Sequence, residues 1–163
     1  MTTQATDRRR SPYLPPRWFI RAAWILHRAL HRFTRGRRGL WLPNDDRWGT
    51  MLLTSTGRRT GQKREAILGY YQDGANIVTL AMNGWGAAEP AWWLNLQAEP
   101  AATLRLKDRT TQVHAREAVG DERDRLWARW LELGDDVDGY SIRRPAETAV
   151  VVLDPVGTPI SRT

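Results

Sequence analysis

Short apolar runs separated by turn residues fill the chain after residue 50, a pattern typical of antiparallel strands. Two neighbouring runs flank Asp73-Gly74 and two more flank Asp108, so each pair predicts a hairpin. We therefore predict a mainly β protein of the α+β type, with an antiparallel sheet or small barrel and helices outside it. The predicted strands are residues 51–54, 64–72, 77–81, 102–107, 110–119 and 149–153, with Pro155 closing the last.

Three other segments have helical patterns. Residues 91–96 follow Pro90, a residue well tolerated where a helix begins, and residues 121–133 are amphipathic with an acidic first turn. In residues 17–34 the apolar side chains collect on one side of a helix and the arginines on the other. The arginine stripe consists of Arg17, Arg21, Arg28, Arg32 and Arg35.

The formal net charge of +7 is concentrated near the start of the chain. Ten of the 25 Lys and Arg residues lie in residues 1–40, together with a single acidic residue, Asp7. We therefore divide the chain into a basic arm with an amphipathic helix, residues 1–40, and a nearly neutral domain, residues 41–163. Charge confined to an arm argues against a nucleic-acid-binding module, in which basic residues usually cover the binding surface.

The amphipathic helix of the arm has two interpretations. Either it packs its apolar face on the domain, or it lies in the interface of an anionic membrane with its arginines at the headgroups. Arginine interrupts the apolar run too often for a transmembrane helix, and a secretion-signal pattern is missing. We expect a cytoplasmic protein, peripheral on the inner face of the cell membrane if the second interpretation holds.

The chain has no cysteine, which excludes disulfides, thiol nucleophiles, iron–sulfur clusters and cysteine zinc sites. It has three histidines, two of them four residues apart in the basic helix. This leaves little for a transition metal, so we expect no metal site.

The most informative stretch runs from Thr54 to Arg64, between the first two predicted strands. It contains two glycines and no acidic residue. Backbone amides in a Gly/Thr turn, together with arginine side chains, make a good anion site, whereas the alternative is an ordinary solvated hairpin turn. The four cations of the stretch are Arg58, Arg59, Lys63 and Arg64.

A second stretch, residues 81–86, combines glycines with Trp85 and leads to the adjacent residues Trp92 and Trp93. Glycines let a backbone approach a flat ligand closely, and adjacent tryptophans can wall a planar aromatic ring. The alternative is that one of the two adjacent tryptophans belongs to the core.

Three motifs in this order resemble the deazaflavin-dependent nitroreductase family of actinobacteria, which are split-β-barrel oxidoreductases that use coenzyme F420. They are LTSTGRRTGQ at residues 53–62, PAWWLNL at residues 90–96 with Pro100 after it, and VVVLDP at residues 150–155. The resemblance implies a split β-barrel of about six antiparallel strands with flanking helices. It also implies a hydride transfer from reduced deazaflavin to an electron-poor acceptor, with the chemistry supplied by the cofactor.

The resemblance further implies which residues hold F420, whose planar deazaflavin carries a phosphate and an oligoglutamate tail. The phosphate and tail would be held by Arg58, Arg59, Thr60, Gly61, Gln62, Lys63 and Arg64. The deazaflavin would be bordered by Leu80, Ala81, Met82 and Asn83, and by Ala91, Trp92, Trp93, Leu94 and Asn95.

The part of the predicted site that would bind the hydride acceptor departs from the family pattern. Trp85 replaces a glycine, and of several tyrosines that precede the last strand only Tyr140 remains. We assign Trp85, Val137 and Tyr140 to the acceptor side, with Tyr140 or solvent protonating the product. Fewer phenol donors predict poor reduction of nitroimidazoles and better turnover of flat quinones or enones.

Two alternative functions follow from related barrels. The chain would bind FMN, haem or biliverdin instead of F420, or it would carry a fatty acid or another lipid near a membrane without turnover. Split barrels of this kind commonly dimerise, so a homodimer is a further expectation.

Overall fold

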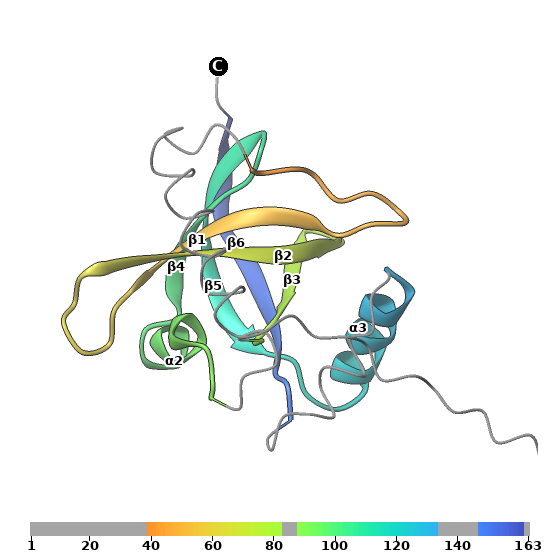
Figure 1. Ribbon diagram of the computed structural model, residues 1–163. Helices are drawn as coiled ribbons and strands as arrows, with labels where there is room; N and C mark the ends of the chain where they lie inside the picture. Colours follow the sequence, from red (N-terminus) through yellow and green to blue (C-terminus); the bar gives the residue numbers. More distant parts are fainter. Residues whose placement is uncertain (1–38, 83–87, 134–146, 162–163) are drawn as a thin grey trace, which may run out of the picture.

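The computed structural model describes residues 39–82, 88–133 and 147–161 (Figure 1). Six strands of this part of the chain close into one antiparallel barrel in the order β1-β2-β3-β6-β5-β4. The strands are β1 (Gly49–Thr56), β2 (Lys63–Asp73), β3 (Asn76–Leu80), β4 (Ala101–Arg105), β5 (Arg109–Glu117) and β6 (Val150–Ser161). The two described helices are α2 (Ala91–Ala98) and α3 (Gly120–Glu132).

The predicted fold class, a mainly β split barrel of six antiparallel strands with flanking helices, is confirmed. The predicted amphipathic helix of residues 17–34 lies outside the described residues. The boundary between arm and domain at residue 40 therefore stays a prediction.

One predicted strand end is wrong. Strand β6 does not close at Pro155 but continues to Ser161. Strand β3 pairs with β6 only as far as Leu153, and beyond that residue β6 pairs with β5 alone. Proline lacks the N–H group that a second neighbouring strand would need, so Pro155 is tolerated where β6 has become an edge.

The main core fills the barrel. Met51 and Leu53 alternate along β1 with residues that face outward, as the period of a strand requires. Trp93 and Leu96 of α2 belong to the same buried cluster, so this helix contributes to the core with one face. Trp92 is also buried there, and both adjacent tryptophans are therefore core residues.

A second core lies between the outer surface of the barrel and α3, which runs alongside the barrel (Figure 1). Tyr71, Val152 and Trp130 are buried in it, from β2, β6 and α3 respectively. The Tyr71 hydroxyl donates a buried hydrogen bond of 2.9 Å to the carbonyl oxygen of Leu126 on α3. This bond fixes the position of α3 along strand β2.

Candidate functional site

The loop between β1 and β2, with the first residues of β2, carries the four predicted cations. We call residues 57–64 the basic loop; it projects from the barrel beside α2 (Figure 1). The side chains of Arg58, Arg59, Lys63 and Arg64 are all exposed. In the described residues none of them forms an ion pair with a carboxylate, and their side-chain hydrogen bonds run only to Asn95, Thr56 and Gln62.

Several arginines elsewhere in the domain have a different environment. Five of them lie within ion-pair distance of carboxylates, and these are Arg109, Arg116, Arg123, Arg125 and Arg129. A cation without a carboxylate partner keeps its full charge for a ligand. The basic loop is thus a place in the described domain where four cations without carboxylate partners lie close together.

Hydrogen bonds within the basic loop set its shape. The carbonyl oxygen of Gly57 accepts from the amides of Thr60 and Gly61, at 3.2 and 2.7 Å, and the Gly57 amide donates to Gln62 at 2.8 Å. Gly61 has a φ of +70°, a conformation that glycine adopts without strain. A Cβ on Gly57 would lie 3.0 Å from the Gln62 carbonyl oxygen, so the turn also needs glycine there.

Most amides of the turn already have partners. Hydrogen bonds within the loop occupy the amides of Gly57, Thr60 and Gly61, which the sequence pattern assigns to the anion site. The Arg58 amide is occupied as well, because it donates to the Asn95 side chain at 3.2 Å. An anion at this loop would therefore be bound chiefly by the arginine and lysine side chains.

Ser55 is a residue of this region that sequence reasoning missed. Its side chain is 1% exposed, and its hydroxyl oxygen has no hydrogen-bond partner in the described structure. It lies opposite Arg64 in the β1–β2 ladder, two residues before the basic loop begins. A signal existed in the sequence, because Ser55 continues the inward-facing series of Met51 and Leu53 with a polar side chain.

The residues expected at the deazaflavin ring lie on two elements. Leu80 and Ala81, at the end of β3, are buried, and Met82 is partly buried. Ala81 belongs to the same core cluster as Trp92 and Trp93 of α2, so both predicted segments contribute to the main core. On α2, Ala91 is exposed, Leu94 is partly buried and Asn95 is buried.

Four of the predicted site residues belong to two connections outside the described residues. Asn83 and Trp85 of the β3–α2 connection lie outside the described residues, as do Val137 and Tyr140 of the α3–β6 connection. Helix α3 ends at Glu132 and is followed by the buried residue Leu133, from which the second connection starts. The acceptor side of the site therefore stays a prediction.

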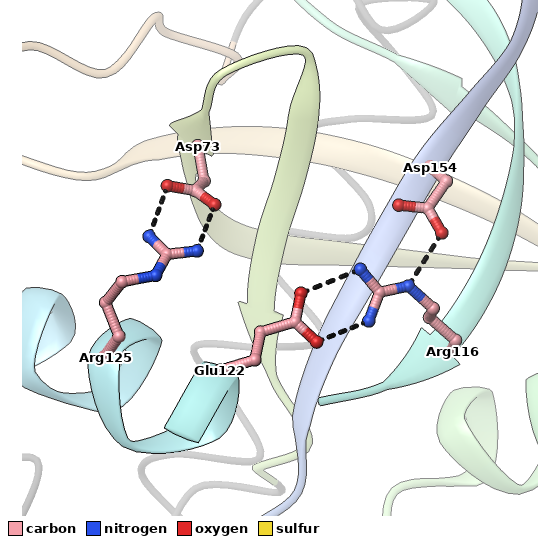
Figure 2. A network of polar contacts seen from close by, with 5 residues as sticks. All are labelled: Asp73, Arg116, Glu122, Arg125 and Asp154. Atoms are coloured by element: carbon pink, nitrogen blue, oxygen red, sulfur yellow. Dashed lines mark hydrogen bonds and ion pairs between the residues drawn. The ribbon is translucent and has the colours of Figure 1, made fainter. Parts of the chain in front are cut away.

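Helix α3 is attached to the barrel by two groups of ion pairs (Figure 2). Arg125 binds Asp73, at the end of β2, through two contacts of 2.8 Å. Arg116 on β5 binds Glu122 of α3 at 2.6 and 2.8 Å and Asp154 of β6 at 2.9 Å. These contacts fix the helix from which the predicted acceptor segment departs.

Two kinds of feature are absent from the described residues. No helix among them is long and apolar enough to cross a membrane. No group of three or more His, Asp and Glu side chains in this part of the chain is arranged to hold a metal ion.

The fold is that of split-barrel proteins. It is similar to a solved structure of an F420-H2 dependent reductase, FDR-A, with a TM-score of 0.59 and 23% identity over 71% of this chain and 100% of the other. It is also similar to a solved domain-swapped dimer, with a TM-score of 0.61 and 22% identity over 82% and 99% of the two chains. At these identities the likeness concerns the fold alone.

Sequence comparison shows the family. The profile of the family described as F420H(2)-dependent quinone reductase matches residues 24–155. The F420H(2)-dependent quinone reductase Rv1261c of Mycobacterium tuberculosis is 32% identical over 117 residues, which cover 68% of this chain and 77% of the relative. The chain belongs to the F420H(2)-dependent quinone reductase family.

Family membership confirms the resemblance found in the motifs. The protein is an oxidoreductase of the split-barrel type, and its cofactor is coenzyme F420. The small-molecule acceptor of the family is a quinone, which agrees with the expectation of a flat acceptor.

The residues present fit this cofactor. F420 is anionic beyond its ring, and the basic loop offers four exposed cations that no described carboxylate neutralises. The unpartnered Ser55 hydroxyl lies at the root of the same loop.

Proposed function

We propose that the basic loop holds the phosphate and oligoglutamate of F420 and that the ring lies toward the end of β3 and the start of α2. The observation that carries this proposal is the gathering of four exposed cations in one loop, none of them paired with a described carboxylate, whereas five arginines elsewhere are ion-paired. When bound, reduced F420 supplies a hydride. The residues of this chain bind and orient the cofactor and keep water from the reacting face.

The individual residues have different roles in this proposal. Arg58, Arg59, Lys63 and Arg64 donate charge-assisted hydrogen bonds to the anionic groups. Thr60, Gly61 and Gln62 keep the loop in shape, through the bonds described above. Leu80, Ala81 and Met82, with Ala91, Trp92, Trp93 and Leu94, supply the apolar surroundings of the ring.

The acceptor is proposed to be a flat quinone that enters beside Trp85 and the segment of Val137 and Tyr140. These residues lie outside the described structure, and their assignment depends on the sequence pattern. The family description and the loss of phenol donors both favour a quinone over a nitroimidazole.

We propose in addition that the arm of residues 17–34 lies on an anionic membrane surface, where lipid-soluble quinones dissolve. The stripe of arginines supports this, because basic amphipathic helices bind anionic headgroups. Sedimentation of the full-length chain with anionic vesicles, and its release by high salt, would support the proposal. Full-length protein that stays in the supernatant with anionic vesicles would contradict it.

A homodimer is proposed as the assembly, with support from the dimeric fold neighbour. Light scattering of the purified chain should give twice the monomer mass of 18.7 kDa. A mass equal to one chain at micromolar concentration would contradict this assembly.

Titration of the purified protein with F420, FMN and haem tests the cofactor assignment. F420 should bind most tightly, and its affinity should fall as ionic strength rises, because exposed charge pairs are screened by salt. The loaded protein should then oxidise F420H2 when a quinone is added. Tighter binding of FMN or haem would instead support the alternative split-barrel functions.

A further inference from the structure

Asn95 joins α2 to the basic loop. Its side chain is 5% exposed, and its Oδ1 atom accepts hydrogen bonds from the Arg58 amide at 3.2 Å and from Arg58 Nη1 at 3.5 Å. The two residues are 37 positions apart in the chain. The contact therefore connects two elements that lie far apart in the sequence.

In the described structure, this contact attaches the loop to α2. The other hydrogen bonds of the loop in the described structure stay within it or run to β1. Gly61 is solvent-exposed, with nothing within 4 Å of the position that a Cβ would occupy there. Without Asn95, the loop would be anchored only at its two strand ends.

The chemical nature of the hydrogen-bond acceptor on residue 95 matters as much as its position. A carboxylate in place of the Asn95 amide would lie within ion-pair distance of the Arg58 guanidinium. It would hold the loop equally well but would neutralise one of its cations. A neutral carbonyl oxygen holds the backbone of Arg58 and leaves the charge of the loop intact.

We infer that Asn95 is a positioning residue of the F420 site: it holds the basic loop against α2 through a neutral acceptor, which keeps Arg58 in place without cancelling its charge. The inference rests on the proposed function of the loop. It differs from the role that the sequence resemblance implied for Asn95, which was direct contact with the cofactor.

Limited proteolysis tests the first half of this inference without any cofactor. Trypsin cleaves after Arg and Lys, so cleavage within residues 58–64 reports how often the loop opens. Asn95→Leu keeps the approximate size of the side chain but removes the hydrogen-bond acceptor. It should therefore speed cleavage in the loop by about two- to tenfold. Gln97→Leu is the matched control, because it makes the same change on the exposed face of α2 and should leave the rate unchanged.

The Asn95→Asp variant tests the second half and also protects against a folding defect in Asn95→Leu. It keeps a hydrogen-bond acceptor for the Arg58 amide, so trypsin should cleave its loop at the wild-type rate. Its affinity for F420 should nevertheless fall by roughly tenfold, because the new carboxylate pairs with Arg58. The dependence of that affinity on salt should weaken as well.

Three results would overturn the inference. They are wild-type cleavage of the loop in Asn95→Leu, rapid cleavage in Asn95→Asp, and wild-type affinity for F420 in Asn95→Asp. Failure of the proposed function gives a different result, since substitution of Arg58 and Arg59 would then leave F420 affinity unchanged while the cleavage rates still respond to Asn95→Leu.

Discussion

Asp73 and Arg125 are 52 residues apart in the chain and meet in a two-bond ion pair, with both nitrogen–oxygen distances at 2.8 Å. Asp73 ends β2, and Arg125 lies on α3, so the pair joins a barrel hairpin to the helix (Figure 2). Glu122, one turn earlier in α3, is held by Arg116 in the same way. The helix is therefore attached to the barrel by polar contacts as well as by the second core.

Acid should loosen this attachment. The hydrogen bonds from Arg125 lower the pKa of Asp73, and those from Arg116 lower the pKa of Glu122. A lowered folded-state pKa means that the stabilisation is complete above the unfolded-state value and is lost as the pH falls through the folded-state value. The Tm measured in thermal melts should thus not change through this effect above about pH 5, and it should fall as the pH drops below that value.

The double variant Asp73→Asn/Glu122→Gln separates this effect from the other carboxylates. It should melt at a lower temperature than the wild type at neutral pH, and the difference should shrink as the pH is lowered toward 2. A difference in Tm that stays constant with pH would show that these two carboxylates do not contribute through their charge.

Tyr70 and Tyr71 are neighbours in β2 that should respond in opposite ways to loss of the hydroxyl. Tyr71 donates a buried hydrogen bond to Leu126, whereas the Tyr70 hydroxyl has no partner in the described residues although the side chain is fully buried. Burial raises the pKa of Tyr70 to about 12, so the hydroxyl is protonated at neutral pH.

Tyr71→Phe should therefore destabilise the domain by about 0.5–1.5 kcal/mol, the usual net value of a hydrogen bond. Tyr70→Phe removes only an unsatisfied polar group and should be neutral or stabilising. Urea denaturation of both variants and the wild type measures the difference. A clear loss of stability in Tyr70→Phe would indicate that a bound water or ligand normally satisfies that hydroxyl.

Trp85→Gly should broaden the range of acceptors. The substitution restores the residue that the family pattern has at this position, and it removes a large ring that we place at the acceptor entrance. The affinity for F420 should change little, because the basic loop belongs to a different connection of the barrel. The measurement is the loss of reduced-cofactor absorbance with a panel of quinones, enones and nitroimidazoles, for both proteins.

Fast turnover of nitroimidazoles by the wild type would contradict the assignment of the acceptor side. A collapse of F420 affinity in Trp85→Gly would contradict it as well, because Trp85 would then belong to the cofactor site.

Much of the fold could be predicted because the strands follow simple rules. Apolar runs and turn residues located all six strands, and the amphipathic pattern located α3. The end of β6 could not be predicted, because the tolerance of Pro155 depends on which strands pair with β6 at that point.

The candidate site could be predicted only in part. The four cations of the basic loop stand out in the sequence, but their lack of carboxylate partners depends on the tertiary structure. The same holds for Asn95, whose acceptor atom meets Arg58 only after α2 has packed into the barrel. Ser55 receives no separate role in the sequence analysis, because the predicted strand of residues 51–54 ends one residue before the inward-facing position that Ser55 occupies in β1.

The affinity of F420 for the Arg58→Ala/Arg59→Ala variant tests the central claim most directly. The matched control is Arg47→Ala/Lys107→Ala, which removes the same charge from exposed positions outside the basic loop. We predict that the control binds F420 like the wild type, whereas the loop variant binds it roughly a hundredfold more weakly, since each charge-assisted bond contributes about 1.5–3 kcal/mol and a tenfold change corresponds to about 1.4 kcal/mol. Equal affinities of the loop variant and the wild type would contradict the claim that this loop holds the anionic part of the cofactor.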